Sequence, residues 1–220
     1  MAPDPGDGDV TVVIPAYNEA TRIRPVVAAL VDRYSVLVVD DASVDATAAV
    51  AESAGATVIR RSRNRGYLAA LRQGFAAVTT PVVVTLDADG EHDPADVPAV
   101  AAPVLADEAD VVFGVRERIP RPSERLLSWL ANRHPAVDVG DTGTGFRALR
   151  TDLARALDIG TVCPCGTLAL EAAGAGARLA TVPIETRSVA KPRGVAWGHG
   201  RQLVAVVRRL LEMSAASTVG

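Results

Sequence analysis

The stretch Val82-Val83-Val84-Thr85-Leu86-Asp87-Ala88-Asp89-Gly90-Glu91-His92 runs from an apolar segment directly into an acidic cluster. Side chains alternate along a strand, so Asp87 and Asp89 project to the same side where the strand ends. Two carboxylates at one strand end repel each other unless a cation lies between them. Carboxylate oxygens suit Mg²⁺ or Mn²⁺, whose remaining positions phosphate oxygens and water fill. The stretch therefore predicts a strand that ends at a metal-bound phosphate, and the alternative is a solvated acidic turn.

Short Val-rich runs alternate with longer Ala-rich segments of helical character, which is typical of βαβ units with a mostly parallel sheet. Expected strands lie at 10–14, 36–39, 57–59, 82–86 and 111–113. Expected helices lie at 22–32, 46–54, 67–77 and 96–105. After Pro120 we expect a helix at 123–132, a strand or extended loop at 137–148, a helix at 167–173, a strand at 179–184 and a helix at 202–213. With 220 residues, the sequence predicts one α/β domain with helices flanking a central sheet.

The composition narrows the class of protein. Hydrophobic residues make up 49% of the chain but aromatic residues only 4%, so the core must consist largely of Val, Ala and Leu. The net charge of −3 argues against general nucleic-acid binding. Cys163 and Cys165 are separated only by Pro164, which fits neither a disulfide framework nor a zinc site. A reduced, cytoplasmic chain is the simple interpretation.

The termini predict how the chain is divided. Residues 1–9 read as a flexible tail without the basic and apolar pattern of a signal peptide, followed by a domain at 10–195. Residues 196–220 read as an amphipathic helix and a tail, and no apolar run reaches the roughly 20 residues that span a bilayer. The segment Leu203–Leu211 is apolar with a basic side, so it either lies on an anionic membrane or packs on its own domain or on a partner.

Polar residues follow each of the first five expected strands. These segments are 15–19, 40–43, 60–66, 87–92 and 114–116. In open α/β sheets, ligands bind outside the carboxyl ends of the strands, so we predict a binding site along this edge. The chain has no G-x-G-x-x-G after the first strand and no G-x-x-x-x-G-K-[ST], which counts against a dinucleotide oxidoreductase and a P-loop NTPase.

Several of these segments, taken in order, resemble the family-2 glycosyltransferases of GT-A fold. The matching motifs are Val12-Val13-Ile14-Pro15-Ala16-Tyr17-Asn18-Glu19, Val38-Val39-Asp40-Asp41-Ala42-Ser43, Asn64-Arg65-Gly66 and Asp87-Ala88-Asp89-Gly90-Glu91-His92. The later Asp141-Thr142-Gly143-Thr144-Gly145-Phe146-Arg147 narrows the resemblance to the dolichyl-phosphate mannose synthase branch. The resemblance covers about residues 10–193 and implies inverting transfer of a hexose from GDP-mannose or UDP-glucose to a polyprenyl (dolichyl) phosphate.

The resemblance also implies which residues bind the nucleotide sugar. The residues that would line the donor pocket or reach the base and ribose are Pro15, Ala16, Tyr17, Glu19, Asp41, Asn64, Gly66 and Asp87. Carboxylates accept from base N–H and ribose hydroxyl groups, and glycine lets backbone N–H groups approach a ligand. For Asp40, a ligand role and capping of the following helix are equal alternatives.

At the metal site, the resemblance implies that Asp89 and Glu91 hold Mn²⁺ or Mg²⁺, with Asp87 supporting the ion or reaching the ribose. Glu91 stands where the family usually has Gln, so it keeps an oxygen ligand and adds a negative charge. The sequence leaves the metal preference open. His92 either orients the loop or is a surface imidazole.

Acceptor recognition falls to cations, because a phosphate monoester needs charge-assisted hydrogen bonds. The resemblance implies that Arg116, Arg125, Ser128 and Arg147 bind this phosphate, and that Asp89, Arg116 and Arg147 are catalytic. Glu124 stands where a basic residue is expected, and Arg125 is turned from that position by ~100° on a helix.

Two other functions stay open, and Cys163-Pro164-Cys165-Gly166-Thr167, which replaces an acidic segment of the family, motivates the second of them. One is a soluble glycosyltransferase with a hydroxyl acceptor, for which Asp141 is the first candidate base. The other is a non-catalytic nucleotide-sugar-binding subunit. The lipid acceptor in turn predicts a peripheral position at the cytoplasmic face of the membrane, on the lipid surface or on a membrane subunit reached through the C-terminal helix.

Overall fold

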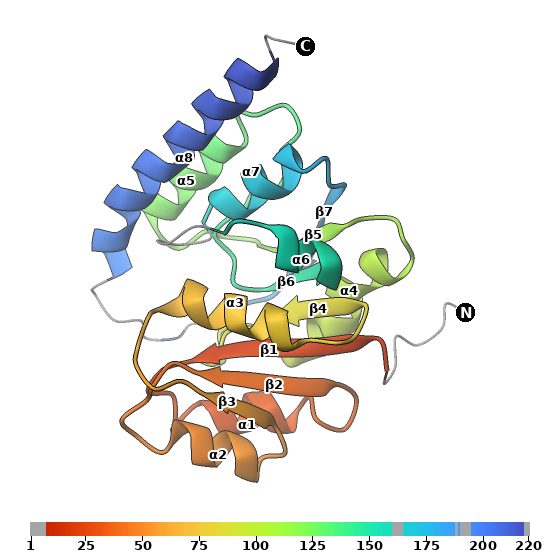
Figure 1. Ribbon diagram of the computed structural model, residues 1–220, viewed down its shortest axis with the longest axis vertical. Helices are drawn as coiled ribbons and strands as arrows, with labels where there is room; N and C mark the ends of the chain where they lie inside the picture. Colours follow the sequence, from red (N-terminus) through yellow and green to blue (C-terminus); the bar gives the residue numbers. More distant parts are fainter. Residues whose placement is uncertain (1–7, 160–164, 188, 190–194, 218–220) are drawn as a thin grey trace.

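The computed structural model describes residues 8–159, 165–187, 189 and 195–217 (Figure 1). Most of the predicted N-terminal tail, together with Cys163 and Pro164, lies outside the described residues. The described chain forms a seven-stranded sheet in the order β3-β2-β1-β4-β6-β5-β7. All neighbouring strands are parallel except β6, which is antiparallel to both β4 and β5. The predicted α/β class with a mostly parallel sheet is confirmed.

The strands of the sheet begin and end close to the predicted positions. They are β1 (Val10–Ala16), β2 (Ser35–Asp40), β3 (Thr57–Arg60), β4 (Val82–Thr85), β5 (Val111–Arg116), β6 (Arg147–Arg150) and β7 (Leu179–Ile184). Every residue of β1 is buried, as expected for a central strand that helices cover on both faces. Of the two alternatives for 137–148, the structure shows a loop, which leads into the short β6 at Arg147.

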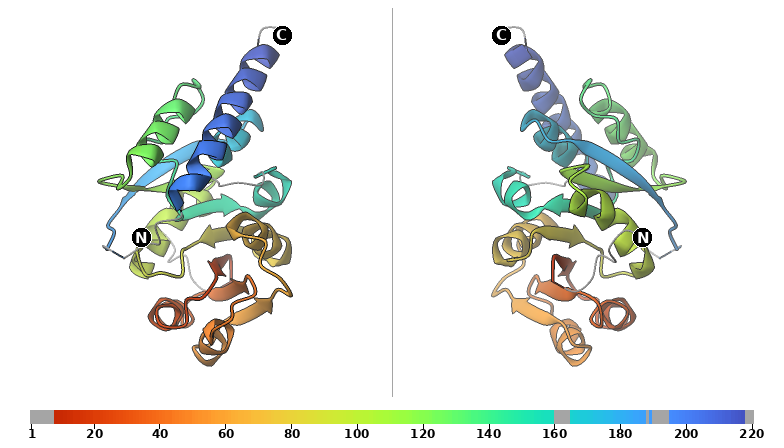
Figure 2. Two further views of the ribbon diagram at one scale, coloured as in Figure 1. Left: turned by 90° about the vertical axis from the view of Figure 1, so that its left-hand side faces the viewer. Right: turned by 90° about the vertical axis from the view of Figure 1, so that its right-hand side faces the viewer.

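Helices cover both faces of the sheet, as the two edge-on views in Figure 2 show. One face carries α1 (Ile23–Ala28), α2 (Thr47–Ser53) and α4 (Val97–Leu105), which follows the 3-10 turn η1 (Pro94–Asp96). The opposite face carries α3 (Tyr67–Ala77), α5 (Pro122–Ala131), α6 (Thr151–Ala156), α7 (Thr167–Gly174) and α8 (Val195–Ser217). Helix α6 was not predicted, and α8 is longer at both ends than the predicted 202–213.

Two close contacts fix the elements that frame the candidate site. A Cβ added at Gly74 would lie 2.4 Å from Val13 Cγ1, so glycine lets α3 lie directly on β1. Helix α8 packs against α5 and α7 through Val206, which is fully buried. The Gln202 amide also donates to the Cys165 carbonyl at 2.7 Å. The inner face of α8 therefore belongs to the core of the domain, and no helix of the described chain is long and apolar enough to cross a membrane.

Candidate active site

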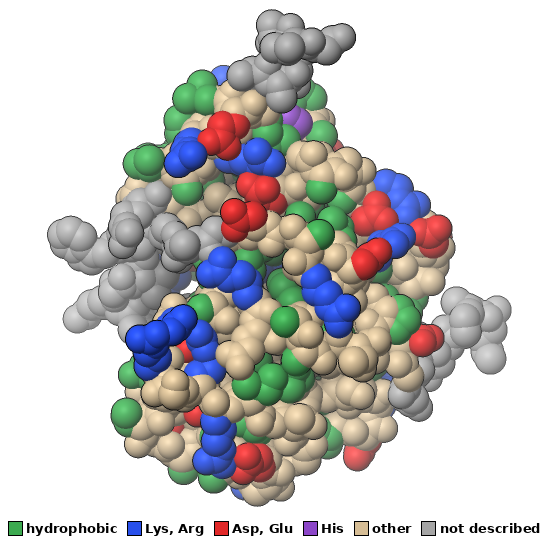
Figure 3. Space-filling view, in the orientation of Figure 1, with side chains coloured by type: hydrophobic (Ala, Val, Ile, Leu, Met, Phe, Trp, Pro, Cys, Tyr) green, Lys and Arg blue, Asp and Glu red, His purple; other side chains and the backbone are tan. Residues whose placement is uncertain are grey.

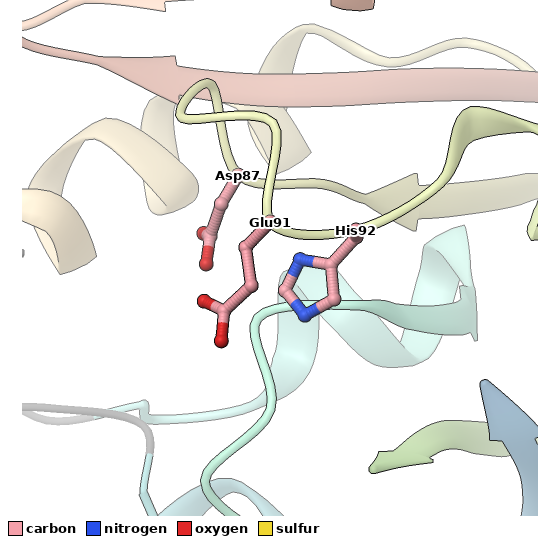
Figure 4. A group of neighbouring side chains, drawn as sticks. All are labelled: Asp87, Glu91 and His92. Carbon is pink, nitrogen blue, oxygen red and sulfur yellow. The ribbon is translucent and has the colours of Figure 1, made fainter. Parts of the chain in front are cut away.

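The acidic cluster lies in the turn that follows β4. Gly90 has φ +75°, and this turn brings Glu91 and His92 back beside Asp87. One ligand atom from each of these three residues lies within 4.8 Å of the other two. In Figure 4 the carboxylates of Asp87 and Glu91 point to the same side, with the imidazole of His92 beside Glu91. Glu91 and His92 are 6% and 1% exposed, so the alternative of a solvated acidic turn does not describe them.

The position of Asp87 depends on residues from two other elements. The hydroxyl of Tyr67, the first residue of α3, donates to Asp87 Oδ1 at 3.2 Å. On the other side, a Cβ added at Gly145 would lie 2.3 Å from Asp87 Oδ2. Real Cβ atoms essentially never come this close to another heavy atom. Gly145 is therefore a site residue that the sequence analysis did not single out, although it lies inside the quoted Thr-Gly-Phe motif.

Asp89 and Glu19 add two further carboxylates near this turn. Asp89 Oδ1 accepts the backbone N–H of Glu91 at 3.0 Å, which holds the turn. The group formed by Asp87, Glu91 and His92 does not include Asp89, and its role as a metal ligand stays a prediction. Burial raises the pKa of Glu19, and the negative charges of Asp89 and Asp87 raise it further, against the opposing charge of Arg22. A cation at this site would relieve that repulsion.

The exits of β1 and β2 are joined by hydrogen bonds between the segments that follow these two strands. The backbone N–H of Asn18 donates to Ser43 Oγ at 2.9 Å, and Asn18 Oδ1 accepts the N–H of Val44 at 2.9 Å. Asp40 accepts the N–H of Ser43 at 3.3 Å, so it holds this turn rather than capping α2. Pro15 and Ala16 are buried at the end of β1, while Tyr17 is 45% exposed.

Asp41 holds the loop between β3 and α3. Its carboxylate accepts the backbone N–H groups of Arg65 and Gly66, at 3.1 and 2.6 Å, and pairs with Arg61 at 2.7 Å. Asn64 Oδ1 also accepts the N–H of Gly66, at 3.2 Å. A hollow of about 440 Å³ opens at the start of α3, and its lining includes Arg61, Arg65, Gly66, Tyr67 and Arg72. Figure 3 shows basic side chains gathered over this part of the surface.

Arg116 lies at the end of β5 among carboxylates. Its Nε donates to Asp141 Oδ2 at 2.6 Å, its Nη2 donates to Glu124 Oε2 at 3.1 Å, and its Nη1 lies 3.7 Å from Glu91 Oε1. Burial lowers the pKa of Arg116, but hydrogen bonding and the charges of Asp141, Glu124 and Glu91 outweigh it, and the net shift is upward. We predicted that Arg116 would bind the acceptor phosphate, whereas its hydrogen bonds are directed at carboxylates in this structure.

The other two predicted acceptor residues, Arg125 and Ser128, lie on different sides of α5. Glu124 and Ser128 face inward at 5% and 1% exposure, and the Ser128 hydroxyl accepts the N–H of Thr142 at 3.1 Å. Arg125 is exposed, as its ~100° rotation from Glu124 on the helix requires. The structure therefore brings Ser128 to the loop that carries Asp141 but leaves Arg125 outside this group.

Arg147 is the predicted acceptor residue with unused hydrogen-bonding capacity. Its side chain is fully buried, and none of its three nitrogens has a hydrogen-bond partner among the described residues. The guanidinium carbon lies over the ring of Phe113, 5.9 Å from the ring centroid. Arg147 is paired with Thr85 across β4 and β6, so it projects from the sheet face that α3 covers. The site thus contains one buried cation without a hydrogen-bonded anion.

A sheet of this topology, with polar side chains and an acidic cluster at the carboxyl ends of its strands, defines a nucleotide-sugar-binding domain of the GT-A type. The sequence matches glycosyl transferase family 2 over residues 11–171, and the chain belongs to this family. It is accordingly a glycosyltransferase with a GT-A fold.

Two curated relatives are similar to most of the chain. The chain is 38% identical over 155 residues to an uncharacterised glycosyltransferase of Mycobacterium tuberculosis, covering 66% of this chain and 70% of the relative. It is 32% identical over 203 residues to the undecaprenyl-phosphate mannosyltransferase of Micrococcus luteus, covering 80% of this chain and 82% of the relative.

Among solved structures, the chain is similar to the glucosyl-3-phosphoglycerate synthase of M. tuberculosis in complex with phosphoglyceric acid. The TM-score is 0.76 at 25% identity, with 93% of this chain and 79% of that chain covered. Other structures of that synthase contain Mn²⁺ or Mg²⁺ with uridine diphosphate, and at 24% identity they show likeness in fold.

Proposed function

We propose that the chain transfers a hexose from GDP-mannose or UDP-glucose to a polyprenyl phosphate, with inversion at the anomeric carbon. The similarity to the M. luteus relative supports this proposal, because that protein is named for a polyprenyl-phosphate acceptor and the match spans most of both chains. A dolichyl or undecaprenyl chain would satisfy the same phosphate chemistry.

The observation that carries the proposal is the buried guanidinium of Arg147 without a hydrogen-bond partner. An unpaired buried charge costs on the order of several kcal/mol, so we expect an anion to compensate it in the working complex. A phosphate monoester accepts the two parallel N–H groups that a guanidinium offers. We therefore assign the acceptor phosphate to Arg147. Arg116 holds Asp141 and Glu124 in place through its hydrogen bonds.

The donor would bind at the exits of β1 and β2. Both oxygens of Asp41 already accept from Arg61, Arg65 and Gly66, so Asp41 would shape the donor pocket chiefly through the loop that it holds, and its contact with the base or ribose stays a prediction. Tyr17 is exposed at this edge and offers an aromatic face, while Arg65 and Arg72 in the adjoining hollow would attract the diphosphate. Glu19 and Asn64 complete the predicted pocket.

The residues at the end of β4 fit a divalent ion, Mn²⁺ or Mg²⁺, because Asp87 and Glu91 offer oxygen ligands on one side of the turn. Asp89 remains a predicted further ligand. When bound there, the ion would neutralise the nucleoside diphosphate as it leaves.

The reaction needs no base in this scheme. An anionic oxygen of the acceptor phosphate attacks the anomeric carbon, a carbon–oxygen bond forms, and the bond to the donor diphosphate breaks with its electron pair on the diphosphate. The side chains contribute by positioning and by charge: Arg147 orients the attacking phosphate, and Asp41 and its loop hold the donor.

We also propose that the enzyme works at the cytoplasmic face of a membrane through a surface formed by α5 and α8. Seven large hydrophobic side chains of the described residues are exposed, and five lie on these two helices: Leu126, Trp129, Val204, Val207 and Leu211. The guanidinium of Arg133 stacks on Trp129, 4.8 Å from the ring centroid. An apolar surface edged by arginine suits an anionic bilayer.

A sedimentation assay with anionic liposomes tests this α5–α8 surface. The double variant Trp129→Ser and Val207→Ser should lose most of the binding. Val44→Ser changes a side chain that is 87% exposed elsewhere and should bind as the wild type does. Equal sedimentation of all three proteins would reject the membrane contact.

The transfer itself is tested with a panel of radiolabelled nucleotide sugars, polyprenyl phosphate and Mn²⁺, Mg²⁺ or EDTA, followed by organic extraction. We expect metal-dependent label in the lipid phase, and none when the acceptor is a polyprenol without the phosphate. Arg147→Met should lose the transfer, while Arg24→Met, on the opposite face of the sheet, should keep it. Donor binding without label in any lipid would favour a non-catalytic subunit.

A soluble acceptor is the second candidate, and the geometry restricts its chemistry. Asp141 was the first candidate base for a hydroxyl acceptor, but both of its oxygens accept hydrogen bonds from Arg116, and Oδ1 also accepts the N–H of Gly143. The buried Arg147 instead favours an acceptor that carries an anion, like the phosphoglyceric acid bound by the structurally similar synthase. Label in a water-soluble product resistant to mild acid would support this candidate.

A further inference from the structure

His92 is fixed in the candidate site rather than exposed at the surface. Its ring is 1% exposed and meets Phe146 edge-on, with the ring centroids 5.6 Å apart and the planes at 61°. The backbone on both sides is also held, because His92 forms a β-bridge with Thr186 and the N–H of Arg187 donates to the Glu91 carbonyl at 2.7 Å. The imidazole is therefore presented beside Asp87 and Glu91 in one orientation.

The spacing of the three side chains fits a single ion. Two ligand atoms bound at about 2.1 Å from a metal lie at most about 4.2 Å apart. The three ligand atoms here lie within 4.8 Å of one another, so a pair at that limit needs a contraction of roughly half an ångström to bind on opposite sides of one ion. Glu91 is the side chain with the rotatable bonds to supply this movement, and Figure 4 shows it between the other two.

We propose that His92 supplies a nitrogen ligand to the divalent ion, so that this site holds Mn²⁺ in preference to Mg²⁺. This inference rests on the proposed function for the presence of the ion and goes beyond it in naming the ligand and the metal. Mg²⁺ demands near-ideal octahedral oxygen ligation, whereas first-row transition ions accept imidazole.

The charges of the site agree with a neutral third ligand. Asp87 and Glu91 together carry two negative charges, which one divalent ion balances. Asp141 and Glu124 also lie close to Glu91, because all three contact Arg116, so the region is rich in negative charge. An imidazole adds a third ligand without adding to this charge.

The experiment is Mn²⁺ binding followed by pulsed electron paramagnetic resonance, without nucleotide or acceptor. The wild-type protein should show nitrogen coupling to Mn²⁺, and the coupling should change to that of ¹⁵N when the protein is labelled with ¹⁵N-histidine. In competition, Mg²⁺ should displace Mn²⁺ only when the Mg²⁺ concentration is at least ~10-fold higher than the Mn²⁺ concentration. His92→Gln should remove the coupling and lower Mn²⁺ affinity about 10-fold or more. His134→Gln should change neither.

The labelled wild-type protein keeps the test independent of how well the His92 variant folds. Bound Mn²⁺ without nitrogen coupling would overturn the proposal and leave the proposed transferase function intact. Equal affinities for Mg²⁺ and Mn²⁺ would overturn the metal preference. Failure to bind any divalent ion, together with metal-independent transfer, would refute the metal site of the proposed function itself.

Discussion

Replacement of Gly145 by alanine should displace Asp87 without unfolding the protein. The new methyl group would lie 2.3 Å from Asp87 Oδ2 and 2.5 Å from both Cγ and Oδ1, whereas ordinary contacts begin at 3.4 Å. The carboxylate must therefore move by about 1 Å, and it loses its hydrogen bond from Tyr67. Misplacement of a reacting group by about 1 Å can cost on the order of 100-fold in rate. Because the displaced group is the end of a side chain, we expect a loss of only about 1–3 kcal/mol in stability.

The assay compares Mn²⁺ affinity, transfer rate and thermal unfolding for Gly145→Ala and Gly143→Ala. A Cβ at Gly143 meets its nearest atom, Arg116 Nη2, at 3.3 Å, so the same methyl group in the same loop needs a shift of a few tenths of an ångström. We expect Mn²⁺ binding and transfer to fall about 100-fold in Gly145→Ala and at most a few-fold in the control. Wild-type binding and transfer in a folded Gly145→Ala protein would show that the position of Asp87 is not needed.

Three further changes test other parts of the structure. Arg147→Met should keep or raise the free energy of unfolding, measured by chemical denaturation, because it removes an unpaired buried charge. The same variant should lower kcat/KM for polyprenyl phosphate about 100-fold in steady-state kinetics. Glu124→Gln should lower the free energy of unfolding by about 2 kcal/mol, measured by urea titration, because Arg116 loses a charged partner. The hydrogen bond from Arg178 lowers the pKa of Asp110 to about 2 from its ordinary 3.8, so this pair stabilises the fold above about pH 4 and its contribution disappears as the pH falls toward 2. Asp110→Asn should therefore flatten the loss of stability across that window in thermal melts.

The sheet could be predicted from the sequence because each main strand is a short apolar run with polar residues directly after it. The apolar runs of β1 and β4 are buried along their whole length, and each ends in polar residues that no buried strand could continue. The position of Asp87 at the carboxyl end of β4 follows from the same pattern. Helix α6 was missed because its six residues, Thr151–Ala156, follow β6 directly without a turn signal between them.

Contacts between distant parts of the chain could not be predicted in the same way. Gly145 lies 58 residues from Asp87, and the pattern around either residue gives no sign of their close approach. Likewise, Glu124 looked like a departure from a basic position, but it is buried against Arg116 and also accepts from Arg121 at 2.8 Å. The motifs identified the residue types of the site, and tertiary packing decided which charges are paired.

The excess of carboxylates in the site also predicts that the divalent ion binds before the donor. Glu91, Glu124 and Asp141 are each at most 6% exposed and surround Arg116, and Asp87 adds a fourth carboxylate nearby. Arg116, together with Arg121 on Glu124, does not balance these four carboxylates, so this part of the site repels the donor diphosphate until a divalent ion binds. We therefore expect donor affinity to fall at least ~10-fold in EDTA, measured by calorimetry with UDP-glucose or GDP-mannose. The double variant Asp87→Asn and Glu91→Gln should bind the donor with little metal dependence, because it no longer presents the repelling charge. Donor binding that is equally strong with and without metal in the wild-type protein would contradict this order.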